Sequence, residues 1–449
     1  MISARSALVA GVIIISAAAL SPAVAAAAPA AQNTAAPQQT GLRPVCGGLL
    51  ARLGCEVEVA TTNGTAAPMV TGSGPLGWGA TDLQKAHQIP TLGTRSGTIA
   101  VIDVGADPQL ESDLGVYRAQ YGMPACTTAN GCFQQLDYQG GPALPPATSA
   151  DDKAIDEEIA FETSLDVEMA SAACPACHLT EIQIPDSAVP STPPPGQPSN
   201  FDGYAQAFAT ATQTAVAHGA SAVSMSYGLP GDAAMLQGSI ANGLDHPGVA
   251  ITASAGDGGF QGDAYLWPQA LPTVTSVGGT ELVEQSGLYV EGAWSQTGSG
   301  CTPTASAPAG QPAKVSGYCA GGRSSTDVSA VADNVAVYDT YTPATGEQLG
   351  WLVAAGTSAA SPFIAGVYAA AGHLGAVHGP NTLYQAPSFA FHDVTSGGNA
   401  SIGDASGDCL PVNAALSGST TTFAGPLCAA QSGWDGPTGL GSPRGLLGF

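Results

Sequence analysis

The sequence predicts an α/β fold in which a parallel β-sheet is covered by helices on both faces. Short apolar runs of the length of buried strands alternate with segments whose apolar residues recur at helical spacing. No long linker interrupts the chain between Leu76 and Phe449, so this stretch is expected to form one large domain. The active site of such a sheet lies beyond the carboxyl ends of its strands.

The first predicted strand is the apolar run from Thr98 to Val104, and a helix is predicted after it over residues 108–121. Leu110, Leu114 and Tyr117 share one face of that helix. Further strands are predicted at 179–184, 222–225, 249–254 and 351–355, and further helices at 159–173, 201–217, 232–243 and from Gly356 to about Gly372.

The amino-terminal residues predict export. Arg5, an apolar run over about 7–20 and small residues over 23–28 follow the order of a secretory signal peptide, which is expected to cover residues 1–28. Residues 29–75 are interpreted as a leader or linker with a short cysteine-containing segment, and residues 76–449 as the main domain. No later segment is long and apolar enough to span a membrane, so a secreted, extracellular protein is expected.

The charge balance excludes one class of partner. Ten Lys and Arg against 34 Asp and Glu give a net charge of −24, which repels nucleic acids and anionic membranes. Because an acidic surface loses repulsion as its carboxylates are protonated, acidic conditions are expected to be tolerated. We expect protein or peptide partners and a monomer.

The ten cysteines occur as close pairs. An even count in an exported chain predicts disulfide bonds, although the sequence leaves their connectivity open. Cys174 and Cys177 form a C-x-x-C motif that also suits a redox or metal pair, but no second ligand pair accompanies it. The neighbouring pairs are Cys46 and Cys55, Cys126 and Cys132, Cys174 and Cys177, Cys301 and Cys319, and Cys409 and Cys428.

Ser358 is the candidate nucleophile. It lies in Gly-Thr-Ser-Ala-Ala-Ser-Pro (356–362), between an apolar strand and a helix of small residues. A serine at a helix N-terminus has unpaired backbone N–H groups nearby that favour developing negative charge. Pro362 is expected in the first helical turn, where it needs no intrahelical partner. The alternative is that the serine only caps the helix.

The base for this serine is predicted to be a carboxylate. None of the seven histidines lies in a His-Gly-Thr segment that opens a helix, as a subtilisin-like triad requires. Glu162 and Asp166 lie four residues apart on one face of a predicted helix, where two like charges are unfavourable unless they are used or protonated. The alternative is a solvated acidic face.

Asp257 is the third candidate carboxyl group. It follows the strand 249–254 directly, in Ala-Gly-Asp-Gly-Gly (255–259), where glycines let a substrate backbone approach. A carboxyl group at this edge of the sheet is suited to act on an oxyanion. The alternative is an ordinary Gly-Asp-Gly turn.

Together, these segments resemble the sedolisins, serine-carboxyl peptidases with a subtilisin-like fold. The family's Glu-x-x-x-Asp matches Glu162 and Asp166, its Ala-Gly-Asp turn matches Asp257, and its Gly-Thr-Ser-x-x-x-Pro includes Ser358. The resemblance covers roughly 76–449 and implies a secreted, acid-active endopeptidase. It implies that Glu162 takes the proton of Ser358, that Asp166 supports Glu162, and that protonated Asp257 hydrogen-bonds the oxyanion.

The resemblance also implies one structural Ca²⁺ near the C-terminus. Asp393 and Asp435 are expected to bind it through side chains, and Val394, Gln431 and Gly433 through backbone oxygens. Gln431 stands where the family usually has glycine. The alternative is a pair of turn aspartates.

One departure from the family leaves zymogen control open. Sedolisins carry a long inhibitory prosegment, whereas only about fifty residues separate the predicted signal peptide from the predicted domain here. The short leader favours one alternative to the peptidase, a catalytically silent secreted homologue that acts as a binding protein. A second alternative keeps the peptidase activity but assigns it to a subtilisin-type histidine triad. Substitution of each histidine, compared with substitution of Glu162, distinguishes the second of these from the carboxylate mechanism.

Overall fold

The computed structural model describes nine stretches of the chain. All of them lie in one compact unit, Ala36–Phe449. The predicted signal peptide, most of the predicted leader, and Cys46 and Cys55 lie outside the described residues. The described stretches are 42–45, 57–61, 74–91, 94–189, 201–230, 233–263, 266–402, 408–412 and 421–449.

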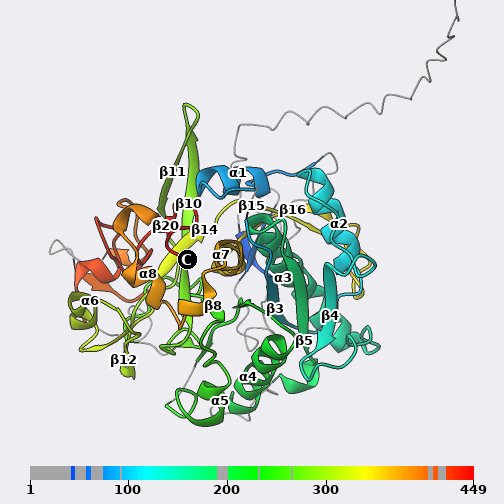
Figure 1. Ribbon diagram of the computed structural model, residues 1–449, viewed down its shortest axis with the longest axis horizontal. Helices are drawn as coiled ribbons and strands as arrows, with labels where there is room; N and C mark the ends of the chain where they lie inside the picture. The colour runs from blue at the N-terminus through cyan, green and yellow to red at the C-terminus, as the bar shows by residue number, and fades with distance from the viewer. Residues whose placement is uncertain are drawn as a thin grey trace, which may run out of the picture. The chain divides into compact units, whose positions relative to one another are not determined.

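An eight-stranded sheet forms the centre of the described fold and confirms the predicted α/β class (Figure 1). Its order is β11-β10-β8-β6-β3-β5-β4, and β14 pairs with β10. All pairs are parallel except β10 with β11. The strands are β3 (Thr98–Val104), β4 (Phe133–Asp137), β5 (His178–Ile184), β6 (Ala222–Met225), β8 (Ala250–Ser254), β10 (Thr275–Gln285), β11 (Leu288–Ala293) and β14 (Val328–Val331).

Helices cover both faces of this sheet, as predicted. α3 and α7 pack against each other and against the central strands, whereas α4 and α5 lie on the other side of the sheet (Figure 1). The helices are α1 (Ala80–Ala86), α2 (Leu110–Gln120), α3 (Ala150–Ala173), α4 (Asp202–Ala217), α5 (Gly238–Asn242), α6 (Ala313–Tyr318), α7 (Thr357–Ala371) and α8 (Asn381–Gln385), with 3₁₀ turns at Asp186–Ala188, Leu374–Ala376, Ser388–Ala390 and Gly425–Leu427.

A second, four-stranded sheet has the order β1-β2-β16-β15 and is antiparallel throughout. Its strands are β1 (Leu42–Pro44), β2 (Glu58–Ala60), β15 (Val335–Asp339) and β16 (Gly350–Ala355). Two-stranded pairings complete the described strands: β7 (Leu229–Pro230) with β9 (Leu266–Trp267), β12 (Cys301–Ser306) with β13 (Gly322–Ser324), β17 (Phe391–His392) with β20 (Ser442–Pro443), and β18 (Ser401–Ile402) with β19 (Cys409–Leu410).

Two predicted helices have different bounds in the structure. The helix predicted at 159–173 begins earlier, at Ala150, because the Ser149 side chain accepts a hydrogen bond from the Asp152 N–H and caps it. Of the helix predicted at 232–243, the described residues 233–243 are helical only over Gly238–Asn242. Gly238 has φ 68°, a left-handed conformation that a right-handed helix cannot continue through.

The contact between α3 and α7 depends on a glycine. A Cβ atom at Gly366 of α7 would lie 2.6 Å from the Cβ of Ala173 and 2.8 Å from the carbonyl oxygen of Ala170, both on α3. No side chain fits at these distances without moving one helix. The absent side chain therefore sets how closely the two helices approach.

Gly366→Ala is expected to lower the free energy of unfolding by about 1–3 kcal/mol, the usual effect of overpacking. Gly115→Ala in α2 is the matched control. Gly115 is also helical, but nothing lies within 4 Å of its added methyl group, so this change is expected to raise stability by up to about 1 kcal/mol. Thermal melts of both variants check the prediction, and a Gly366→Ala protein as stable as wild type contradicts it.

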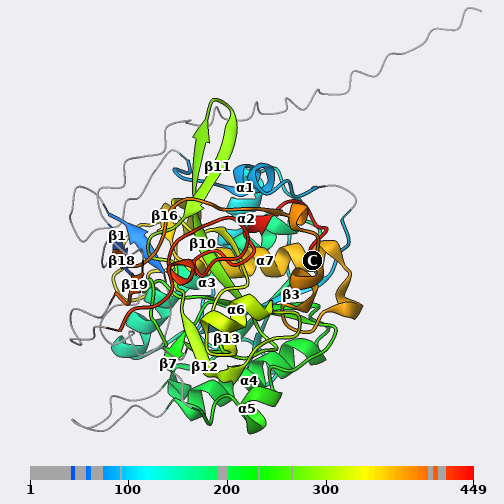
Figure 2. The same cartoon turned by 90° about the vertical axis from the view of Figure 1, so that its left-hand side faces the viewer.

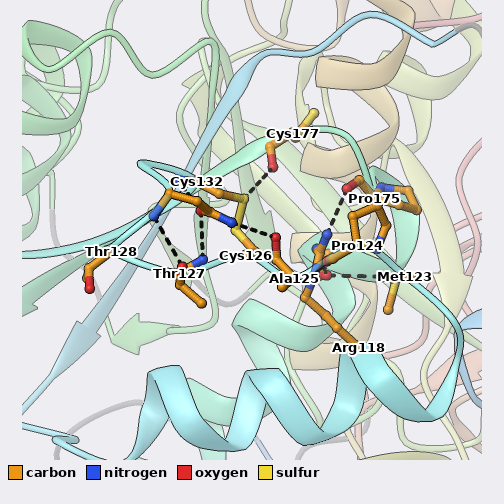
Figure 3. The surroundings of a disulfide bond; sticks show 12 residues. Arg118, Met123, Pro124, Ala125, Cys126, Thr127, Thr128, Cys132, Pro175 and Cys177 are labelled. Carbon is orange, nitrogen blue, oxygen red and sulfur yellow. Dashed lines mark hydrogen bonds between the residues drawn. A yellow bond between two sulfur atoms is a disulfide. The ribbon is translucent and has the colours of Figure 1, made fainter.

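Four disulfides join the cysteine pairs that lie in the described residues: Cys126–Cys132, Cys174–Cys177, Cys301–Cys319 and Cys409–Cys428. Cys174 and Cys177 are fully buried, as suits a structural bridge. Figure 3 shows the first bridge beside buried Arg118, whose guanidinium donates to the carbonyl oxygens of Pro124 (2.6 Å) and Pro175 (2.8 Å).

The β10–β11 hairpin extends beyond the rest of the sheet (Figures 1 and 2). Val283 and Val290 face each other across it and are about half exposed. Among the described helices, none combines the length and apolarity that a membrane span requires.

Candidate active site

Ser358 is the second residue of α7 and is fully buried. β16 leads into the helix through Gly356, which has φ 155° and ψ 149°, a combination that residues with a side chain rarely adopt. Gly356, and not Ser358, takes the N-cap position. The serine therefore lies inside the first turn, where the backbone N–H groups have no acceptor within the helix.

Asp257 caps the same helix from the end of β8. Its Oδ1 accepts hydrogen bonds from the Thr357 N–H and from the Thr357 hydroxyl, both at 2.8 Å. Its Oδ2 is buried and has no hydrogen-bond partner among the described residues. Burial raises the pKa of Asp257 well above its usual value, so this carboxyl group stays protonated to higher pH and can then donate from Oδ2.

Glu162 and Asp166 lie one turn apart on α3, and both are fully buried. The Ser226 hydroxyl donates to Asp166 Oδ1 at 2.8 Å and lies 3.4 Å from the Ser358 carbonyl oxygen. Ser226 therefore links α3 to the first turn of α7. These burial values exclude the solvated acidic face that the sequence left open for Glu162 and Asp166.

A third carboxyl group, which the sequence analysis missed, joins this pair. Asp103 lies in β3, is fully buried, and has its pKa raised to about 7 by burial. Burial also raises the pKa of Asp166 well above its usual value, and the charges of Asp103 and Glu162 raise it further. Burial and the two neighbouring carboxylates therefore all disfavour the ionised form of Asp166. An aspartate within an otherwise apolar strand was the signal that could have found Asp103.

The position of Pro362 corrects one prediction. It is the sixth residue of α7, so it lies in the second turn and not in the first. Proline lacks the N–H that would otherwise donate to the carbonyl oxygen four residues earlier, which belongs to Ser358. The Ser226 hydroxyl lies 3.4 Å from that oxygen instead.

Two of the histidines make their contacts outside the carboxyl cluster. His87 is fully buried, with its Nδ1 3.9 Å from Glu291 Oε2, and burial lowers its pKa. His378 Nε2 lies 2.7 Å from Asp245 Oδ1. These contacts give the two imidazoles roles outside the carboxyl cluster.

Two segments that hold the predicted calcium ligands, residues 393–394 and 431–435, contact each other. The Gln431 N–H donates to Asp435 Oδ2 (2.9 Å), and the Gly433 N–H donates to Asp393 Oδ1 (3.0 Å). Val394 is buried directly after Asp393. Burial raises the pKa of Asp435 to about 7, and the charge of Asp393 adds to this effect.

Comparisons with known proteins agree with the geometry. Residues 194–374 match the model of the subtilase family, peptidase S8. Kumamolisin from Bacillus sp. (strain MN-32) is 28% identical over 399 residues, which cover 83% of this chain and 63% of that protein. The structure of Pseudomonas sedolisin, a serine-carboxyl proteinase complexed with two molecules of pseudo-iodotyrostatin, superposes with a TM-score of 0.56 at 21% identity and covers 83% of this chain and 96% of that one.

Proposed function

We propose that this chain, which has a subtilisin-like fold and is similar to kumamolisin, is a secreted serine-carboxyl endopeptidase active in acid. The similarity to the subtilase family and to kumamolisin supports a serine-type peptidase that acts on proteins or peptides. One observation carries the assignment to the serine-carboxyl subclass. Asp257 accepts a hydrogen bond from the first residue of α7, the helix that holds Ser358, and α3, which packs against α7, holds buried Glu162 and Asp166.

In this proposal, Glu162 removes the proton from the Ser358 hydroxyl while its oxygen attacks the peptide carbonyl. Asp166 supports Glu162, and the hydrogen bond from Ser226 holds Asp166 in place. Asp257 donates from Oδ2 to the oxyanion that forms, because Oδ1 is already occupied by Thr357. Glu162 then returns the proton to the leaving amine, and water releases the acyl group by the same steps.

The direct test is hydrolysis of casein by the purified protein across acidic pH, with the products identified by mass spectrometry. Internal cleavage products at acidic pH support an endopeptidase. Tripeptides released only from amino termini contradict that part of the proposal. The absence of any product from folded protein at every pH contradicts peptidase activity.

We also propose that Asp393 and Asp435, with the backbone oxygens of Val394, Gln431 and Gly433, hold one Ca²⁺. Two carboxylates that bind the same 431–433 segment suit a hard cation, and a divalent charge would offset both the burial and the charge of Asp393 that raise the pKa of Asp435. The ion would stabilise the loop and takes no part in the chemical steps.

Chelation is therefore expected to lower the melting temperature, because an ion that binds only the native state stabilises it by about 2.7 kcal/mol at a hundred times its Kd. Asp393→Asn is expected to melt lower and to lose most of its response to the chelator. Asp263→Asn, at an exposed aspartate, is the control and should respond like wild type. A chelator-insensitive wild type without bound metal in elemental analysis rules the site out.

A further inference from the structure

The loop that carries Asp257, residues 255–262, is hydrogen-bonded along one edge to the segment 296–301; we call it the Asp257 loop. A Cβ atom at Gly298 would overlap the carbonyl group of Ala255, so the two backbones lie in direct contact just before Asp257. The backbone hydrogen bonds, of 2.5–3.3 Å, run from Gly298 N–H to Gly256, Gly259 N–H to Gln296, Ser299 N–H to Gly259, Gln261 N–H to Ser299 and Cys301 N–H to Gly262.

Phe260 attaches the opposite edge of the Asp257 loop to the C-terminal part of the chain. Its N–H donates to the Asn399 carbonyl oxygen at 2.8 Å, and its own carbonyl oxygen accepts from the Val412 N–H at 3.0 Å. The residues before and after Phe260 bond the segment 296–301 instead, because backbone groups of an extended chain alternate in direction. The Asn399 side chain also donates to the Ser299 hydroxyl at 2.8 Å, so the two flanking segments are joined to each other.

A small core, separate from the main one among the described residues, encloses the Phe260 side chain. Phe260 is fully buried, and the ring of Phe423 packs edge-on against it with centroids 5.3 Å apart. Two disulfides complete this core, Cys301–Cys319 from one flanking segment and Cys409–Cys428 from the other. We call it the Phe260 cluster, and its buried members are Phe260, Cys301, Cys319, Cys409, Leu427 and Cys428.

The Asp257 loop depends on these attachments because it is rich in glycine. Residues 256, 258, 259 and 262 are glycines, which restrict the backbone least, and Phe260 is the one large apolar residue of the loop. Thr357 holds Oδ1 of the Asp257 carboxyl group, but Oδ2 must lie about 2.7–3.1 Å from an oxyanion to donate to it. The backbone position of Asp257 therefore has to be set from outside the loop.

We propose that Phe260 is a positioning residue for Asp257. Anchored between the disulfides Cys301–Cys319 and Cys409–Cys428, it holds the Asp257 loop where Oδ2 meets the oxyanion formed at Ser358. Phe260 takes no part in the chemical steps and acts only through Asp257. This role rests on the proposed peptidase function. Because the oxyanion forms only in the transition state, loss of the anchor is expected to lower kcat more than it raises KM.

The test compares kcat and KM of the full chain on a quenched peptide in acid. Cys409→Ala/Cys428→Ala removes one of the bridges that enclose Phe260. Its kcat is expected to fall about tenfold to a hundredfold, the cost of misplacing a catalytic group by about 1 Å, with little change in KM. The control, Cys126→Ala/Cys132→Ala, removes a bridge beside Arg118, outside the Phe260 cluster, and should keep both constants close to those of wild type (Figure 3).

The pH profile of kcat separates positioning from a general loss of structure. Burial is the main cause of the raised pKa of Asp257; hydrogen bonds from Thr357 lower this pKa, and the charge of Glu58 on β2 raises it. A loosened Phe260 cluster admits water to the Asp257 loop, so the pKa of Asp257, and with it the alkaline limb, should move to lower pH. The control should keep the alkaline limb of wild type, as would a variant that is only partly unfolded.

Hydrogen exchange gives a readout that does not depend on activity. In a Ser358→Ala background, Cys409→Ala/Cys428→Ala is expected to speed the exchange of the amides of residues 259–262. If the double variant lacks a cooperative melt, Phe260→Leu replaces it, with smaller changes of the same sign in kcat, in the alkaline limb and in exchange.

A folded variant with the kcat of wild type overturns the positioning role. A lower kcat with an unmoved alkaline limb, or an equal loss of kcat in the Cys126→Ala/Cys132→Ala control, overturns it as well. Faster exchange at 259–262 without hydrolysis by any protein, wild type included, supports the anchoring of the Asp257 loop by the Phe260 cluster and overturns the peptidase function instead.

Discussion

Replacing Ser358 with alanine is expected to lower kcat/KM for peptide hydrolysis by about 10⁴-fold or more, with little change in the melting temperature. The change deletes the attacking oxygen and leaves the apolar packing of α7 intact. The measurement is the initial rate on a quenched peptide at acidic pH, together with a thermal melt of the same sample.

Ser361→Ala provides the matched control. Ser361 is also a buried serine of α7, but its hydroxyl bonds the hydroxyl groups of Ser224 (2.9 Å) and Thr252 (3.0 Å) on the central sheet. Its loss is expected to cost about 1 kcal/mol of stability and to leave most of the activity. Comparable activity in Ser358→Ala and wild type would remove Ser358 from the mechanism.

Glu162→Gln is expected to lower kcat by about 10²–10⁴-fold, the usual contribution of a general base. Glutamine keeps the shape of the side chain but does not accept the Ser358 proton at working pH. A histidine-based mechanism predicts the opposite pattern, with the loss in one of seven His→Gln variants and not in Glu162→Gln.

Glu168→Gln controls for loss of a buried carboxyl group on the same helix. Glu168 is fully buried on α3, but its Oε2 accepts from the Tyr338 N–H (3.1 Å) of β15. Burial raises its pKa well above the usual value, so the amide replaces a largely protonated acid. Its activity should stay close to that of wild type, and an equal loss in both variants would mean that only helix packing was disturbed.

The parallel sheet and its helices could be predicted because their signals are local. The strand at Thr98–Val104 has its predicted bounds, and that at 222–225 likewise, because continuous apolar runs mark fully buried strands. The bounds predicted for the helix at 232–243 were wrong because the sequence does not show that Gly238 adopts a left-handed conformation. The pairing of β16 with β2 joins residues almost 300 positions apart in the sequence. Local periodicity carries no information about such a contact.

The candidate site was predicted in its residue types but not in its contacts. Spacing on one helix face made Glu162 and Asp166 candidates, and the resemblance to the sedolisins selected them. It gave no indication that Asp257 would cap α7 through Thr357, nor that Ser226 would link Asp166 to the Ser358 carbonyl. Asp103 was missed because an aspartate in an apolar strand has no partner in the sequence, and only the fold brings it to the other carboxyl groups.

The central claim is that carboxyl groups perform both the proton transfer and the oxyanion binding. Activity should rise as the Glu162 and Asp166 pair ionises and provides the base, and fall as Asp257 loses its proton. Burial raises the pKa of Asp257, so the donor stays protonated to higher pH. A glutamate base ionises at lower pH than histidine does, so we expect the maximum in acid.

The most direct test is the pH profile of kcat/KM for wild type and Asp257→Asn, from strong acid to neutrality. Asparagine keeps a neutral donor near the oxyanion but has no proton to lose, so its alkaline limb should weaken or move to higher pH even if the peak rate falls. The account predicts a wild-type maximum below pH 7 and a displaced alkaline limb in the variant, with the acid limb in place. A wild-type maximum above neutrality, or the same alkaline limb in both proteins, would contradict it.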